Sequence, residues 1–329
     1  MPVLVTGGAG YIGSHMVLEL VDAGESVVVL DDLSTGFSWA VPKENVTLVT
    51  GDVGDEKLLD RLIARHKIDG ILHFAAKAVV PESVEDPLAY YLNNTVKSRV
   101  LIAAAVKGGV RDFIFSSTAS VYGNVEADTL SEDLPTAPIN PYGRTKVTTE
   151  WMLEDTRLAH GLRYGILRYF NVAGADPKGR AGQSSPQATH IIKVAAQAAL
   201  GLRPHLDIFG TDYDTPDGTC IRDYVQVTDV ARAHLVALEH LRGGGESVIM
   251  NCGYGHGASV KEVVDVVKKV SGVDFEVRLG PRRGGDPAHL VARVDRLRAL
   301  GWTPHFDDLE EIVSQALRWE RLLAERKAT

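Results

Sequence analysis

The sequence predicts an α/β protein in which a doubly wound parallel sheet is followed by a smaller, mixed α/β lobe. Short β-branched runs alternate with helical patterns through the first half of the chain. Such alternation, with continuously apolar strands, is typical of parallel sheets that helices cover on both faces. A glycine-rich turn from Gly7 to Gly13 also joins the first strand to the first helix. The length of 329 residues suits about two domains.

The first elements lie close together in the sequence. Residues 3–5 form an apolar strand, and residues 11–23 place Ile12, Met16 and Leu20 on one helical stripe that Gly24 closes. Apolar runs predict two further strands at residues 27–30 and 46–49, and a helix is expected over residues 56–65.

The second half of this first unit repeats the alternation. A strand at residues 70–73 precedes a long helix over residues 87–107, which ends at Gly108-Gly109. A strand at residues 112–116, a helix over 142–159 and a strand at 164–167 follow. The order predicts the dinucleotide-binding Rossmann architecture, whose ligands bind at the carboxyl ends of the strands.

The pattern changes after Phe170, so we expect a first domain of residues 1–170 and a second of residues 171–329. Residues 174–185 are expected to form a loop, and residues 189–202 a helix. Short strands at 206–209, 248–251 and 275–279 are assigned to the second lobe, whereas a helix near residues 228–241 is expected to pack back on the first.

Composition excludes several classes of partner. Lys and Arg number 35 against 43 Asp and Glu, which gives a net charge of −8 and no general attraction for nucleic acid or anionic membranes. There is no apolar run of about 18 residues and no signal-peptide pattern. Cys220 and Cys252 form neither a disulfide framework nor a zinc-ligand pattern. We therefore expect a cytoplasmic protein without a metal.

The glycine turn fits a phosphate site. Gly8, Gly10 and Gly13 match G-x-G-x-x-G, and Gly7, Gly10 and Gly13 match a second glycine spacing. Such glycines allow a tight turn and a close approach to a pyrophosphate at the helix N-terminus. The motif alone is weak, but it directly follows a strand and precedes a helix.

An acidic pair at the end of the second strand indicates which dinucleotide binds. Asp31 and Asp32 begin 18 residues after Gly13, where a ribose-binding acid belongs. An acid at this position repels a 2′-phosphate, and no basic residue follows before Lys43. The sequence therefore favours NAD over NADP.

Three further residues suggest proton transfer. Tyr142 and Lys146 are spaced to share a helix face, where a lysine ammonium would lower the tyrosine pKa and make the phenol a usable base. Thr118 ends a hydroxyl-rich segment at the carboxyl end of a strand, and it could hydrogen-bond a reacting sugar hydroxyl.

These motifs closely resemble the UDP-glucose 4-epimerase family within the extended short-chain dehydrogenase/reductase superfamily. The resemblance covers nearly the whole chain. It rests on residues 3–15, 73–79, 168–175, 208–213, 217–219, 221–224 and 281–287, together with Tyr90-Tyr91 and Asn93-Asn94.

The resemblance implies an NAD-dependent isomerase, expected as a homodimer, that inverts C4 of a UDP-sugar through a 4-keto intermediate. Tyr142 would take the proton of the 4-hydroxyl, with Lys146 and Thr118 beside it. Implied cofactor residues are Gly7, Gly10, Tyr11, Ile12, Gly13, Asp31, Asp32, Asp52, Val53, Phe74, Ala75, Ala76, Lys77, Asn93, Ser116, Tyr142, Lys146 and Phe170. Implied substrate residues are Lys77, Thr118, Tyr142, Asn171, His190, Phe209, Arg222, Arg283 and Asp286.

Alternatives remain at this stage. A nucleotide-sugar dehydratase usually carries an Asp-Glu pair after the hydroxyl residue, whereas Ala119-Ser120 follow Thr118 here. The intact Tyr142 and Lys146 argue against a non-catalytic NAD sensor. A 4-epimerase that prefers UDP-hexosamines, pentoses or uronates stays open, because Leu290 occupies the position facing the sugar and does not discriminate among them. Pro81, Leu92, Gln226 and Arg293 depart from the family pattern without removing a reacting group.

Overall fold

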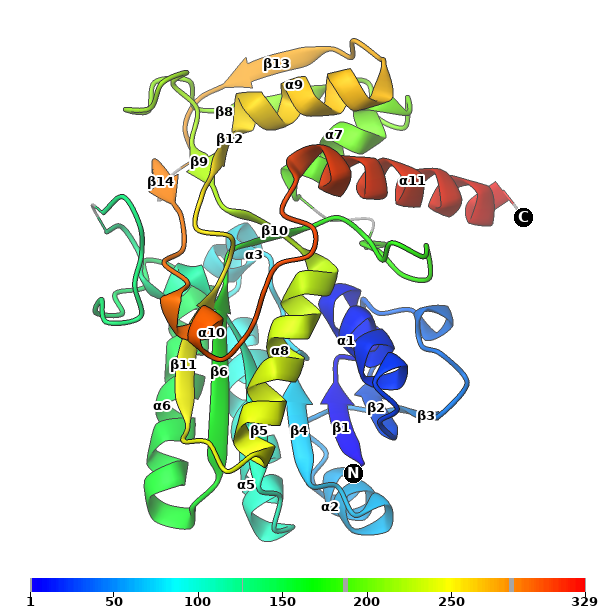
Figure 1. Ribbon diagram of the computed structural model, residues 1–329, viewed down its shortest axis with the longest axis vertical. Helices are drawn as coiled ribbons and strands as arrows, with labels where there is room; N and C mark the ends of the chain where they lie inside the picture. The colour runs from blue at the N-terminus through cyan, green and yellow to red at the C-terminus, as the bar shows by residue number, and fades with distance from the viewer. Residues whose placement is uncertain (1, 126, 186–188, 284–286, 329) are drawn as a thin grey trace.

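The chain is built around a seven-stranded sheet whose strands all run parallel (Figure 1). The computed structural model describes residues 2–125, 127–185, 189–283 and 287–328. The strand order is β11-β6-β5-β4-β1-β2-β3, so β2 and β3 are added on one side of β1 and the later strands on the other, and the strand order reverses between β1 and β4. These strands span Val3–Thr6 (β1), Val27–Asp31 (β2), Val46–Thr50 (β3), Gly70–His73 (β4), Asp112–Thr118 (β5), Arg163–Tyr169 (β6) and Val248–Cys252 (β11). The predicted doubly wound architecture is confirmed.

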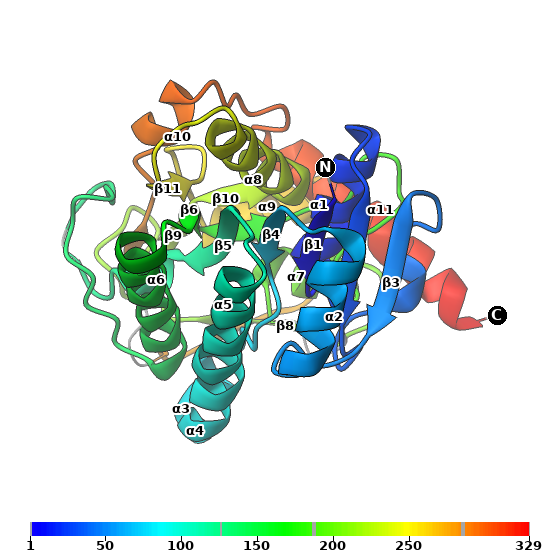
Figure 2. The same ribbon diagram turned by 90° about the horizontal axis from the view of Figure 1, so that it is seen from below.

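Helices cover both faces of this sheet, as Figure 2 shows. One face carries α1 (Tyr11–Asp22) and α8 (Val227–Arg242), which contact each other. The other carries α2 (Glu56–His66), α5 (Lys97–Lys107) and α6 (Pro141–His160). Alternate residues of β1 serve the two faces: Val3 and Val5 belong to one buried cluster and Leu4 to another.

The segment before α5 differs from the single long helix that the sequence predicts. An additional helix, α3 (Val80–Glu85), comes first, and α4 (Pro87–Tyr90) continues into a π-helical turn (η2, Tyr91–Val96) before α5 begins. Pro87 at the first helical position and the Asp86 side chain, which accepts the Ala89 N–H, explain why a new helix starts there. The π turn leaves no signal in hydrophobic periodicity.

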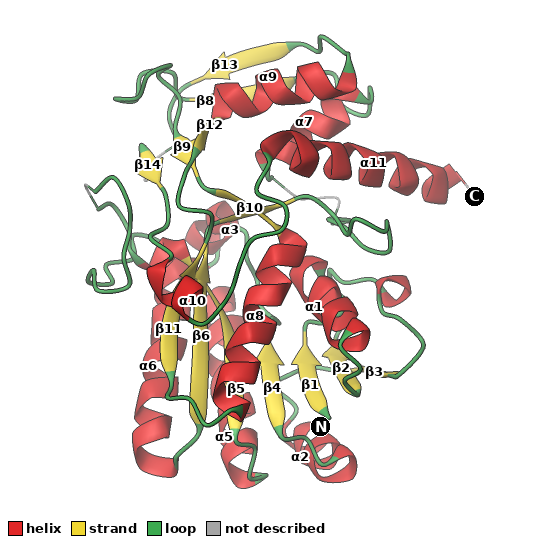
Figure 3. Cartoon of the chain, in the orientation of Figure 1, coloured by secondary structure: helices red, strands yellow, loops and turns green. Residues whose placement is uncertain are grey.

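The second lobe lies above the carboxyl ends of the strands (Figure 3). Its helices α7 (Ile191–Ala199), α9 (Val260–Ser271) and α11 (Leu309–Ala328) pack on one another, and α10 (Asp295–Ala299) contacts β11. Its short strands form small sheets that pair β7 with β10, β8 with β13, and β9 with both β12 and β14. They span Asn171–Ala173 (β7), Leu206–Phe209 (β8), Ile221–Arg222 (β9), Tyr224–Gln226 (β10), Ala258–Ser259 (β12), Val277–Gly280 (β13) and His289–Leu290 (β14). Short 3-10 turns span Ser38–Ala40 (η1) and Ala119–Val121 (η3).

One strand lies elsewhere than the sequence predicts. Residues 248–251 were expected in the second lobe, but β11 pairs with β6 and forms an edge of the main sheet. Its burial explains the placement, because Met250, Asn251 and Cys252 are fully buried against the first domain. The helix near residues 228–241 does pack on the first domain as expected, since α8 contacts α1, β5 and β6. The boundary near residue 170 itself stays a prediction.

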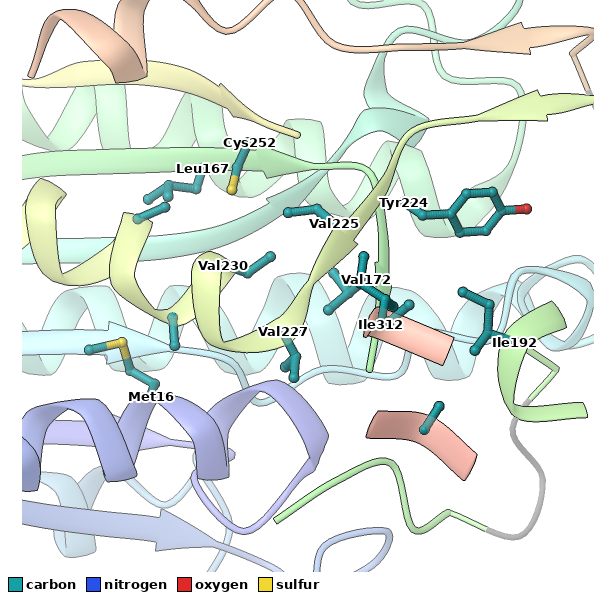
Figure 4. Packing of buried hydrophobic residues seen from close by; sticks show 14 of the residues in the cluster. Met16, Leu167, Val172, Ile192, Tyr224, Val225, Val227, Val230, Cys252 and Ile312 are labelled. Atoms are coloured by element: carbon teal, nitrogen blue, oxygen red, sulfur yellow. The ribbon is translucent and has the colours of Figure 1, made fainter. Parts of the chain in front are cut away.

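A single apolar core joins the two parts of the chain. Figure 4 shows Met16 of α1 and Val230 of α8 in the same cluster as Val172 of β7, Val225 of β10 and Ile312 of α11. The lobe is therefore fixed on the sheet by buried apolar contacts. None of the helices in the described part of the chain is long and apolar enough to cross a membrane.

Replacing Leu238 by Ala tests whether α8 is part of the main core. The side chain is fully buried in the apolar cluster between the sheet and the helices α1 and α8. We therefore expect the free energy of unfolding to fall by about 2–5 kcal/mol. Urea unfolding followed by circular dichroism measures the loss. The control is Leu202→Ala, whose side chain is 53% exposed and whose replacement should cost less than about 0.5 kcal/mol. Equal midpoints for the two variants would contradict the packing described above.

Candidate active site

The glycine turn leaves no room for side chains. Gly7 has a φ of +72°, and a Cβ there would lie 2.5 Å from the backbone nitrogen of Ala75. A Cβ on Gly13 would lie 2.1 Å from the carbonyl oxygen of Gly7. Gly10 precedes α1 and provides no side-chain cap for its first N–H groups. The turn thus presents the N-terminus of α1, next to Tyr11 and Ile12, to an anionic ligand.

Asp31 is tied to this turn. One carboxylate oxygen accepts the Ala9 N–H at 2.9 Å, and the other accepts the Leu33 N–H at 2.8 Å. Burial raises the pKa of Asp31, and these two backbone hydrogen bonds oppose that rise. Asp32 is exposed and accepts hydrogen bonds from Ser34 instead. Of the predicted acidic pair, Asp31 is therefore the one at the glycine turn, with acceptor capacity left for a ribose.

Other predicted cofactor residues follow β3 and β4, at the same sheet edge. Val53 is buried, whereas Asp52 forms an ion pair with Lys97 at 2.6 Å. Phe74, Ala75 and Ala76 continue from β4, where the backbone closely approaches Gly7. The Phe74 N–H donates to the Thr6 carbonyl. The edge at the reversal between β1 and β4 therefore gathers the residues that the sequence assigned to the dinucleotide.

Lys77 is fixed by its backbone and paired by its side chain. Its N–H donates to the Asn94 side chain, which in turn donates to the Lys77 carbonyl. The Lys77 ammonium forms an exposed ion pair with Glu82 of α3 at 2.6 Å. Asn93 donates to the Asn94 carboxamide. The sequence did not assign a role to Asn94. The structure places it in the π turn, where its side chain holds the Lys77 backbone.

The reacting groups lie where α6 crosses the carboxyl end of β5. Asn140 caps α6 through the Gly143 N–H, and Tyr142 and Lys146 then face the sheet, both buried. The Lys146 ammonium donates to the Ser116 carbonyl at 2.8 Å and lies 5.9 Å from the centre of the Tyr142 ring. The Thr118 side chain hydrogen-bonds Tyr142. The structure thus brings Thr118, Tyr142 and Lys146 together.

The electrostatics of this cluster correct one expectation. The sequence predicts that Lys146 lowers the pKa of Tyr142, but burial raises the pKa of Tyr142 to about 12, and the hydrogen bond with Thr118 only partly opposes it. Burial also lowers the pKa of Lys146 to about 7, an effect that Glu150 opposes. Removal from water disfavours the charged forms of both side chains.

Two predicted substrate residues of the second lobe meet in a stacking contact. Phe209 ends β8, which is paired with β13, and Arg283 follows β13. The Arg283 guanidinium lies 4.0 Å from the centre of the Phe209 ring. Phe209 is 37% exposed, so this flat pair is open to a planar ligand.

The strands β9 and β14 connect the lobe to the reacting end. Arg222 of β9 is buried, and it donates to the carbonyls of Ile221 and Ala288. Leu290 of β14 is its register partner. Leu290 also packs on a cluster that contains Ala119 and Phe170. This short sheet therefore reaches the turn that follows Thr118.

The remaining predicted residues are more scattered. Asn171 begins β7, and its N–H donates to the Asp223 carbonyl. His190 directly precedes α7 and is exposed, with the Gln183 side chain 2.6 Å from its Nδ1. Ser116 hydrogen-bonds the Tyr169 hydroxyl. Asp286 lies outside the described residues.

The residues present fit a dinucleotide at the glycine turn. The turn is a cradle that a Cβ at Gly7 or Gly13 would fill, it opens on an uncapped helix N-terminus, and an acid stands at the ribose position. Thr118 ends β5, which lies two strands away from β1 because β4 separates them. Tyr142 and Lys146 of α6 lie beside it. The arrangement can hold a nucleotide cofactor beside a hydroxyl and a phenol that exchange a proton.

Known proteins support the same interpretation. The sequence profile of the NAD dependent epimerase/dehydratase family matches residues 3–253. The UDP-glucose 4-epimerase of Azospirillum brasilense is 59% identical over 322 residues, which make up 98% of this chain and 92% of that protein. The solved structure of UDP-glucose 4-epimerase from Brucella ovis in complex with NAD is 42% identical, with a TM-score of 0.93 over 97% of this chain and 98% of that one. The UDP-Glc/GlcNAc 4-epimerase from Campylobacter jejuni is 48% identical, with a TM-score of 0.86 over 98% and 99% of the two chains.

Replacing Gly13 by Ala tests the turn. The added Cβ would meet the Gly7 carbonyl oxygen at 2.1 Å, so α1 must move away from β1 and the phosphate site is lost. We expect the purified variant to release little or no NAD on denaturation, as measured by chromatography of the released nucleotide. Gly24→Asn is the control, because a Cβ at Gly24 meets nothing within 4 Å and Asn tolerates a positive φ. A Gly13→Ala protein with a full complement of NAD would show that the turn does not hold the cofactor.

Proposed function

This chain belongs to the NAD dependent epimerase/dehydratase family, and we propose that it is an isomerase that interconverts UDP-galactose and UDP-glucose by NAD-dependent inversion at C4. The observation that carries the proposal is the buried set of Thr118, Tyr142 and Lys146 at the sheet edge that also presents the glycine turn. The proteins that it resembles over nearly their full length are UDP-glucose 4-epimerases.

NAD is the cofactor of this family, and when bound it accepts a hydride and brings a positively charged ring that favours a nearby phenolate. We assign it to the glycine turn, with the Asp31 carboxylate accepting hydrogen bonds from the adenosine ribose. The Lys146 ammonium is held in place by its hydrogen bond to the Ser116 carbonyl. Lys77 has an exposed ammonium at the same sheet edge, where it can reach a phosphate or a ribose.

Tyr142 has the position of a proton acceptor. Its hydroxyl is hydrogen-bonded by Thr118, so a sugar 4-hydroxyl placed between the two side chains would donate to Tyr142 and accept from Thr118. Inversion requires that the same pair serves both faces of the sugar in turn, with Tyr142 returning the proton. The low exposure of Tyr142 and Lys146 keeps water from the oxidised intermediate.

The second lobe supplies the nucleotide site. The Phe209 ring is partly exposed and offers a stacking face for uracil, and Arg283 beside it offers a positive charge for the diphosphate. Arg222 approaches from β9, next to Leu290 and the turn after Thr118. These arginines give an acidic protein a local attraction for phosphate, and a firmly held UDP would leave the sugar free to turn.

Replacing Tyr142 by Phe tests the assignment of the base. The variant loses the hydroxyl and keeps the ring, so we expect the rate to fall by about 100- to 10,000-fold with the fold and the NAD content retained. The assay follows the conversion of UDP-galactose to UDP-glucose without added NAD. Near-normal turnover would refute the role of Tyr142.

The substrate panel tests the function itself. UDP-N-acetylgalactosamine, UDP-arabinose and UDP-galacturonate are assayed beside UDP-galactose with wild-type protein. We expect UDP-galactose to have the highest kcat/KM. Wild-type protein that contains NAD and epimerises none of the four would refute the proposed function.

We also infer that the protein forms a homodimer through α6 and the segment of α4 and η2 that precedes α5. Leu88, Leu92 and Val96 follow one another at four-residue spacing along α4 and η2 and are 49–78% exposed. Trp151 and Leu158 of α6 are 57% and 75% exposed. Both α4 and η2 contact α6. An apolar stripe of this kind is self-complementary under a two-fold axis.

Replacing Trp151 by Glu tests this surface. A charge in the centre of an apolar contact costs its desolvation, so the variant should have the mass of one chain, 35.6 kDa, in analytical ultracentrifugation, and wild-type protein twice that mass. Val273→Glu, at a separate position that is 42% exposed, should leave the wild-type mass unchanged. A dimeric Trp151→Glu protein would place the interface elsewhere.

A cytoplasmic location stays a prediction, in keeping with two buried thiols at Cys220 and Cys252.

A further inference from the structure

The helix that carries Tyr142 and Lys146 presents a third functional side chain to the sheet. Glu150 follows Lys146 by one helical turn and faces the same strand. It accepts a hydrogen bond from the Ser117 hydroxyl at 2.5 Å. The three side chains thus meet consecutive residues of β5: Lys146 meets Ser116, Glu150 meets Ser117 and Tyr142 meets Thr118.

Glu150 is also locked from the neighbouring strand. Arg168 of β6 is the register partner of Ser117, and its Nε and Nη2 atoms donate to the two Glu150 carboxylate oxygens at 3.1 and 2.5 Å. The Glu150 and Arg168 side chains are only 3% and 5% exposed. Arg168 further donates to the Tyr122 hydroxyl, which donates to Asn251 of β11. The Glu150 carboxylate is therefore fixed against β5 and β6, with β11 behind them.

A buried ion pair of this kind is poor evidence for stability, because the cost of removing both charges from water is close to the attraction gained. Its effect is geometric. Glu150 links α6 to both β5 and β6, through Ser117 and Arg168, and so sets the rotation and height of the helix against the sheet.

We propose that Glu150 is a positioning residue for the reaction, which fixes Tyr142 and Lys146 against β5 and places a negative charge beneath the Lys146 ammonium. The inference rests on the proposed function, because it assigns a role within the same site. Arg168 and Ser117 act through Glu150, holding its carboxylate in one orientation.

The charges around Lys146 support this role. Burial lowers the pKa of Lys146 to about 7, and the Glu150 carboxylate opposes that effect. The other titratable groups nearby are Tyr142 on α6, Tyr90 on α4, Tyr169 on β6 and His73 on β4, and burial lowers the pKa of His73 to about 3, so it stays neutral. Arg168 is cationic and lies on the far side of Glu150. Among these described groups, Glu150 supplies the negative charge.

The decisive variant removes both charges, E150M with R168M, so that neither is left buried and unpaired. We expect kcat to fall by about tenfold or more, with KM for UDP-galactose and the NAD content within about twofold of wild type. Without the carboxylate, Lys146 loses its proton at a lower pH, so the alkaline limb of the kcat profile should move down by about one pH unit. A folded double variant with wild-type kcat and an unmoved limb would overturn the proposal.

A matched control lies on the same two strands. Asp112 and Arg163 form an ion pair at 2.6 Å where β5 and β6 begin, at the opposite end from the site. D112N with R163M should lower stability and leave the alkaline limb of kcat unmoved. If this pair shifts the limb as far as the Glu150 pair does, the effect is structural and the proposal fails.

Two further measurements support the test: a milder variant that removes no charge, and a titration that does not depend on turnover. Ser117→Ala removes one hydrogen bond to Glu150 and no charge, and we expect a smaller loss of kcat; wild-type kcat in this variant counts against the proposal. Ultraviolet titration of the Tyr142 phenolate in the NAD-loaded protein, with Tyr142→Phe subtracted, should move to higher pH in the double variant. An unmoved titration overturns the positioning role, whereas wild-type protein that turns over none of the UDP-sugars refutes the proposed function alone.

Discussion

The contact between α6 and the carboxyl end of β5 is the constraint on which the chemistry depends. The helix crosses the strand so that three side chains of one face meet three consecutive residues, Ser116 to Thr118. A parallel sheet makes this possible, because all its strands end at one edge and the glycine turn of β1 lies at that edge with β5. A slip of one residue in β5 would turn the Ser117 side chain, which donates to Glu150, to the opposite face of the sheet.

Buried hydrogen bonds of Gln226 and Asp223 hold the segments of the second lobe in place above the sheet. Gln226 caps α8 by accepting the Thr228 and Asp229 N–H groups, while its amide donates to the Ala175 carbonyl and to Gln315 of α11. Asp223 accepts N–H groups from Tyr254, Gly255 and Ala292, which fixes the loop after β11 and the segment after β14. The chain leaves the main sheet after β6, returns to it through α8 and β11, and enters the lobe again after β11, so several connections tie the lobe to the sheet.

Sequence reasoning succeeded where local pattern determines structure. The apolar strands, the glycine motif and the spacing of Tyr142 and Lys146 predicted the sheet, the tight turn before α1 and the pair of side chains on one face of α6. It failed where distant contacts decide. Residues 248–251 are as apolar as any strand of the lobe, and only the free edge of β6 explains their place as β11. The π turn and the Lys77–Asn94 bonds likewise arise from tertiary contacts that no periodicity records. Gln226 departed from the family pattern, yet its amide provides the cap and cross-link described above.

The electrostatics were the least accessible part, because they depend on burial more than on sequence distance. A lysine four residues after a tyrosine suggests an acidic phenol, but that argument holds in water. Inside the protein, burial disfavours the Lys146 ammonium and raises the pKa of Tyr142, so the lysine can act on the phenol only while it keeps its own proton. A site that excludes water to protect an oxidised sugar therefore needs a fixed carboxylate nearby, or it loses the cation on which the phenolate depends. The buried position of Glu150, one turn beyond Lys146, meets that need within the same helix.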